Sequence, residues 1–78
     1  MIKAEIVHTI KDLRIYIDGI LHVHLLSDKY VGMQAWVDGD KHKRYCIEIS
    51  VSGGENILMT YQKVEVWNEV LRLMDENL

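Results

Sequence analysis

The 78-residue chain contains no proline and no phenylalanine, and its single cysteine is Cys46. One cysteine excludes an intramolecular disulfide and a zinc site built from paired cysteines. Without proline, the turns must be formed by Gly, Asp, Asn and Ser. A domain of this size with neither kind of cross-link must pack very well or share its core with a second copy. The composition therefore favours a homodimer.

Long apolar runs are also missing, since none reaches the roughly 20 residues that a transmembrane helix needs. No signal-peptide pattern precedes the folded region, so we expect a cytoplasmic protein without membrane contact. The formal net charge is −3, which argues against a dedicated nucleic-acid binder and is compatible with a protein partner. With 49% hydrophobic and 27% charged residues, residues 1–78 are expected to fold as a single domain.

Known catalytic signatures are absent as well. The sequence has no glycine-rich phosphate-binding loop of the G-x-x-x-x-G-K or G-x-G-x-x-G type. Ser50 and Ser52 precede Gly53 and Gly54, but they form no G-x-S-x-G nucleophile elbow. Cys46 has no base fixed beside it by the sequence, so it is interpreted as a semi-buried small residue. We therefore expect no enzyme activity and no cofactor.

The clearest element is an amphipathic helix over residues 62–78. Apolar residues recur there at helical spacing, and polar residues fill the opposite arc. The apolar positions are Val66, Trp67, Val70, Leu73 and Met74. Thr60 is the only conventional N-cap candidate near the start of the helix.

The segments before the helix alternate between apolar and polar residues, which is typical of strands with one buried face. These segments are residues 13–17, 21–25, 30–37, 44–52 and 57–61, and residues 2–10 fit either a strand or a helix. Short loops favour pairing between sequential antiparallel neighbours. The predicted fold is α+β: an antiparallel meander of five or six strands, with one C-terminal amphipathic helix packed on one face.

Asp18-Gly19 predicts a hairpin between the second and third strands. A two-residue turn would put the apolar residues of the two strands out of phase, so a three-residue loop is preferred. That register pairs Leu13 with Val23 and Ile15 with Leu21. On the other face it pairs three further sets of residues: Asp12 with His24, Arg14 with His22, and Tyr16 with Ile20.

Two weak patterns could bind ligands. His22 and His24 lie two residues apart on one strand, so both could bind a metal with Asp12 or His8 as a third ligand. The favoured interpretation is two tolerated histidines, with His24 paired to Asp12. The basic sequence Lys41-His42-Lys43-Arg44, followed by Tyr45, could bind nucleic acid. A solvated hairpin tip is the favoured interpretation there, so we expect no metal site and no nucleic-acid partner.

The strongest functional prediction concerns apolar residues that break the buried pattern. Trp36 is out of phase with Val31, Met33, Ala35 and Val37, so its strand is buried on both faces or exposes an apolar patch. We expect a small, non-catalytic protein–protein interaction module that forms a homodimer. The expected contact residues are Trp36, Tyr16 and Ile20 on the sheet, and Val66 and Leu73 on the helix.

Two alternatives remain open from the sequence. A phage or mobile-element inhibitor could present acidic helix residues to the basic surface of a host protein. Those residues are Glu65, Glu69, Asp75 and Glu76. A histidine-based metal-binding protein or small metalloenzyme would instead use His22, His24 and Asp12.

Overall fold

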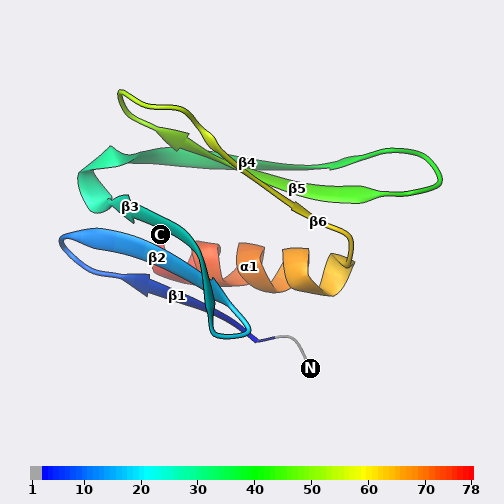
Figure 1. The fold of residues 1–78 in the computed structure, drawn as a ribbon, viewed down its shortest axis with the longest axis horizontal. Helices are drawn as coiled ribbons and strands as arrows, with labels where there is room; N and C mark the ends of the chain where they lie inside the picture. The colour runs from blue at the N-terminus through cyan, green and yellow to red at the C-terminus, as the bar shows by residue number, and fades with distance from the viewer. Residues whose placement is uncertain (1–2) are drawn as a thin grey trace.

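A computed structural model describes residues 3–78, which form two three-stranded antiparallel sheets and one C-terminal helix (Figure 1). The first sheet contains β1 (Ala4–His8), β2 (Asp12–Ile17) and β3 (Ile20–Leu26), in that order. The second contains β4 (Tyr30–Asp38), β5 (Arg44–Val51) and β6 (Ile57–Tyr61). Helix α1 spans Val64–Asn77. The fold is α+β as predicted, but the six strands do not form one continuous meander.

The break between the sheets lies at η1 (Ser27–Lys29), a short 3₁₀-helix. This segment does not fold the chain back into a hairpin, so β4 does not pair with β3. A register shift between Tyr30 and Gly32, opposite Val51 and Ser50, places Val31 in a bulge directly after η1. Such a bulge bends and twists its strand, which helps to direct β4 into the second sheet.

The ambiguous segment at residues 2–10 is a strand where it is described. β1 covers Ala4–His8, and Ile2 lies outside the described residues. Ile10 follows the strand in the β1–β2 turn and is 96% exposed. The strand therefore ends before the last apolar residue of the alternating pattern.

The β2–β3 hairpin corrects the predicted register. Asp18 and Gly19, with φ of 50° and 79°, form a two-residue turn, so Ile17 pairs with Ile20. A bulge at His22 then adds one residue to β3. The resulting pairs are Tyr16 with Leu21, Ile15 with Val23, Arg14 with His24 and Leu13 with Leu25. The extra residue puts Val23 and Leu25 back on the buried face. The sequence analysis attributed this to a three-residue loop.

The core lies between the two sheets and α1. Ile15 and Val23 contribute from the first sheet, and Ile47 and Ile49 from the second. The helix adds Val66, Val70 and Met74 at intervals of four residues, which is the spacing of one helix face. This arrangement confirms that the terminal helix buries an apolar face.

Helix α1 runs beside β1, on the side of the second sheet that faces the core (Figure 1). His8 Nδ1–H donates to the carbonyl of Asn77 at 2.9 Å, so β1 contacts the last turn of the helix. Trp67 Nε1–H donates to the carbonyl of Cys46 at 2.9 Å near the other end. The N-cap residue is Lys63 without a side-chain cap, because Thr60 belongs to β6.

Candidate functional site

The most distinctive surface of the protein is the outer face of the second sheet. Trp36 on β4 pairs with Cys46 on β5, which pairs with Thr60 on β6. Their neighbours Ile47 and Met59 point the opposite way and are buried. Trp36 therefore stands on the solvent side, where 37% of it is exposed. A tryptophan in such a position is typical of a contact surface.

The strand that carries Trp36 is also an edge strand. β4 pairs with β5 on one side only, and its nine residues include no charged side chain before Asp38. Val37 is 47% exposed on the inner face, because it lies at the edge of the sheet. An edge strand presents unpaired backbone N–H and C=O groups, and apolar, uncharged edges readily pair with another strand.

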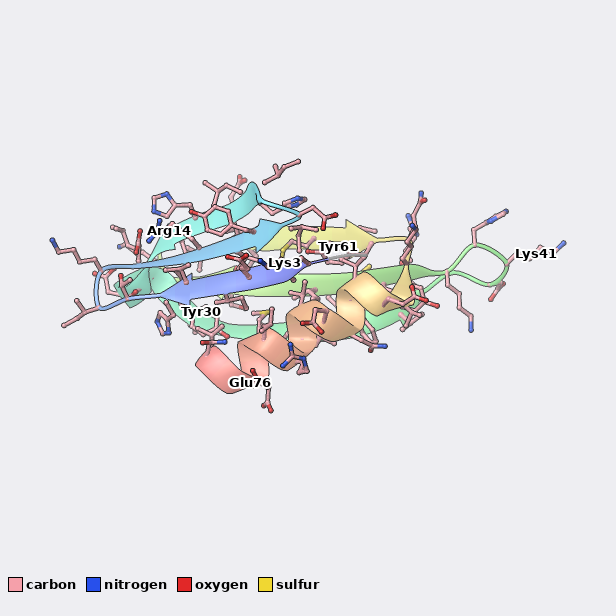
Figure 2. The ribbon with its side chains drawn as sticks, turned by 90° about the horizontal axis from the view of Figure 1, so that it is seen from below. Lys3, Arg14, Tyr30, Lys41, Tyr61 and Glu76 are labelled. Carbon is pink, nitrogen blue, oxygen red and sulfur yellow. The ribbon has the colours of Figure 1, made fainter. Side chains whose placement is uncertain are left out.

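A groove of about 320 Å³ lies between β4 and the C-terminal half of α1. Tyr30 and Met33 line it from β4, Leu71, Met74 and Asp75 line it from the helix, and Leu78 follows directly after the helix. Burial raises the pKa of the Tyr30 hydroxyl. Figure 2 shows the end of α1 near Glu76 extending past the sheet on the β4 side. The edge of β4 therefore borders a groove that is apolar except for Asp75, with a helix on its other side.

The five predicted contact residues are not brought together. Tyr16 and Ile20 belong to the first sheet, whereas Trp36 belongs to the second. Val66 is 8% exposed and faces the core, and Leu73 is half-buried against it. The predicted patch is therefore reduced to Trp36, with Ile20 exposed separately at the β2–β3 turn.

A polar cluster occupies the outer face of the first sheet. His24 Nε2–H donates to Asp12 Oδ2 at 3.0 Å, and Thr9 Oγ1–H donates to Asp12 Oδ1 at 2.8 Å. Arg14 Nε lies 3.4 Å from Asp12 Oδ2, and Arg14 Nη1–H donates to Tyr16 Oη at 3.3 Å (Figure 2). The Thr9 hydrogen bond, followed by His24 and the Arg14 charge, lowers the pKa of Asp12 despite partial desolvation.

The predicted contact between Asp12 and His24 is present, although Arg14 rather than Asp12 is opposite His24 in the register. His22 is the bulged residue and does not join this cluster through a hydrogen bond or ion pair given by the structure. Within residues 3–78, no three His, Cys, Asp or Glu side chains are grouped closely enough to hold a metal ion. The arrangement is that of a structural polar cluster at the end of the β2–β3 ladder.

The basic residues lie at the tip of the long β4–β5 hairpin, which Figure 2 shows reaching beyond the helix at Lys41. Arg44 Nη2–H donates to Asp38 Oδ2 at 3.2 Å, so part of the charge is neutralised locally. The Tyr45 ring lies 5.5 Å from the Trp67 ring between centroids and is half-buried. Tyr45 therefore packs against the helix on one side, and it also lines a cavity of about 790 Å³ with Lys41, His42, Lys43 and Arg44.

The acidic face of α1 is also partly neutralised. Arg72 forms ion pairs with both Glu69 and Glu76, at spacings of three and four residues. The hydrogen bond from Arg72 lowers the pKa of Glu69, and Glu69 in turn raises the pKa of Arg72. This pairing leaves Glu65 and Asp75 as the acidic helix residues outside the Arg72 ion pairs given by the structure.

The sequence analysis did not single out the edge of β4 or the groove beside it. Val37 was assigned to the buried face, and Leu78 was not assigned to any site. The available signal was the run from Tyr30 to Val37, which contains no charged residue. Strand order depends on pairing between distant segments, so this signal could not identify an edge by itself.

Comparisons with models of known protein families, with curated proteins and with solved structures found no match for the chain. Residues 3–78 include no helix with the length and apolar character needed to cross a bilayer. The exposed surfaces of the protein are therefore the features that bear on its function.

Proposed function

We propose that the protein is a small protein–protein interaction module that forms a homodimer through the Trp36 side of β4 and acts without catalysis. The observation that carries the proposal is the exposure of Trp36 and Val37 on an uncharged edge strand. Large aromatic residues contribute most to binding when a partner covers them, and exposed apolar groups at a sheet edge favour association.

The small size of the domain supports the same proposal. A chain of this length buries a smaller fraction of its surface on folding than larger domains do. Covering Trp36 and Val37 with a second copy would remove further apolar area from water. The polar cluster around Asp12 and the basic hairpin contribute nothing that favours a catalytic alternative.

The test is Trp36→Ala, with Ile10→Ala as the matched control. Ile10 is more exposed than Trp36, but it lies in the β1–β2 turn of the other sheet. Truncating a central interface tryptophan costs about 2 kcal/mol or more, and a homodimer carries the change in both copies, so the dissociation constant should rise by roughly 900-fold. Light scattering coupled to size-exclusion chromatography and sedimentation equilibrium would measure the dissociation constants.

We expect the wild-type protein and Ile10→Ala to dimerise with similar affinity, and Trp36→Ala to shift toward the monomer while keeping its circular dichroism spectrum. A wild-type protein that stays monomeric at high concentration would overturn the proposal. Equal affinities for the wild-type protein and Trp36→Ala would overturn the role of Trp36.

A further inference from the structure

We propose that the homodimer forms by antiparallel pairing of β4 with β4 of a second copy, with Ala35 facing Ala35 at the two-fold axis. The inference rests on the proposed homodimer and adds how it is built. Pairing of this kind would join the two second sheets into one six-stranded sheet, with main-chain hydrogen bonds across the interface.

The choice of β4 follows from a comparison of the edges. β1 lies against α1. β6 has five residues, and β3 is interrupted by the bulge at His22. Short and bulged edge strands resist pairing with other chains. β4 has its bulge at Val31, directly after its first residue, so a regular segment of seven residues remains from Gly32 to Asp38.

The midpoint of that regular segment fixes the register. Residues 32–38 are centred on Ala35, so full antiparallel overlap of two copies pairs Met33 with Val37 of the other chain and Gln34 with Trp36. Opposite residues in an antiparallel pair point to the same face. The inner face therefore joins Met33, Ala35 and Val37 of both copies, all of which are apolar.

Charge favours a second copy as the occupant. The paired segment carries one charged residue, Asp38, which would face Gly32 of the other chain rather than another acid. Asp38 also keeps its own partner, Arg44, at 3.2 Å. Self-pairing therefore brings no like charges opposite each other, although the whole chain is acidic.

The groove provides a second and independent argument. In this register Val37 of the other copy lies opposite Met33, which lines the groove together with Leu71, Met74 and Leu78. The added strand would then lie over the part of α1 that extends past the sheet edge (Figure 2). The exposed apolar Val37 of each copy would enter the apolar groove of the other.

Cysteine cross-linking tests the register directly. In a Cys46→Ala background, Ala35→Cys would place two thiols opposite each other at the axis, within the Cα separation of about 4.4–6.8 Å that a disulfide requires. Asp38→Cys is the matched control on the same edge. Its two copies would lie about 20 Å apart, six residues along the pair.

Under mild oxidation we expect Ala35→Cys to become a covalent dimer at least tenfold faster than Asp38→Cys. A second variant, Val37→Glu, should be folded and monomeric, because it places a carboxylate beside a groove of the other copy that is apolar except for the acidic Asp75. Val37 is already half-exposed, so the substitution costs a lone chain little. Ile10→Glu, in the β1–β2 turn, should remain dimeric.

The outcomes separate the two proposals. A wild-type dimer in which Ala35→Cys cross-links no faster than Asp38→Cys would overturn the β4 register, while the homodimer itself would stand. A wild-type dimer that Val37→Glu leaves intact would also count against edge pairing. A wild-type protein that is monomeric at every concentration would refute both proposals.

Discussion

Asp12 is a residue whose charged form is stabilised by its neighbours in the folded protein. The Thr9 hydroxyl, His24 and Arg14 all favour its charged form, so its pKa in the folded protein lies below the ordinary value of 3.8. A carboxyl with a lowered folded pKa stabilises the native state above the unfolded pKa. That contribution is lost as the pH falls through the folded pKa.

We therefore expect Asp12→Asn to be less stable than the wild-type protein at pH 6, with the difference shrinking below about pH 4. Urea unfolding followed by tryptophan fluorescence across pH 2.5–7 would measure the difference. Asp28→Asn, which removes an exposed carboxylate on η1, is the control and should follow the wild-type curve. A constant gap between Asp12→Asn and the wild-type protein at all pH values would contradict the argument.

At the scale of elements, alternation in the sequence predicted strands over five segments and a helix at the end, because one buried face imposes a period on each element. Residues 2–10 were left open between a strand and a helix. The register of the β2–β3 hairpin could not be predicted from this alternation alone. The phase conflict at Asp18-Gly19 was visible, but a longer loop and a bulge at His22 both resolve it. Only contacts with the rest of the core distinguish the two solutions.

The separation into two sheets was also beyond the sequence. Ser27 and Asp28 are residues typical of turns, and a turn of three residues fits either a hairpin or a change of sheet. The outcome depends on η1 and on the bulge at Val31, which together direct β4 away from β3. Neither feature contains a residue such as proline that would predict it from the sequence.

Helix α1 contacts the core mainly through one stripe of buried side chains. Truncating a side chain of this stripe should therefore lower the free energy of unfolding more than a change on the exposed side of the helix. Met74 belongs to this stripe and is almost fully buried against the core. Met74→Ala should lower the free energy of unfolding by about 2–5 kcal/mol, because it leaves a cavity in the core. Asn68→Ala, at an exposed helix position, should change it by less than about 0.5 kcal/mol.

Urea denaturation at one fixed protein concentration would compare the two helix variants with the wild-type protein. A loss below about 1 kcal/mol for Met74→Ala would mean that the core closes around the smaller residue, or that α1 is not packed as described. Equal losses for Met74→Ala and Asn68→Ala would contradict the burial of Met74, because Ala is the best helix former and helix propensity cannot cause a loss in either variant.

At the scale of the whole molecule, the sequence correctly drew attention to Trp36 because it breaks the alternation of its strand. The surrounding site could not be assembled in the same way. Trp36 was grouped with Tyr16 and Ile20 under the assumption of a single sheet, and the two-sheet fold separates them. The groove beside β4 requires the helix and the strand to be placed together, which local patterns do not determine.

If the folded protein is a dimer, its thermal stability must depend on its concentration, because two chains separate when it unfolds. Above the dissociation constant, a 100-fold rise in concentration should raise the Tm by about 5–10 °C for a domain of this size. Val37→Glu should show a constant Tm over the same range, since a monomer unfolds without a change in the number of molecules. Differential scanning calorimetry would measure both series. A wild-type Tm that does not change with concentration would show that each chain folds alone, and the exposed edge of β4 would then need another explanation.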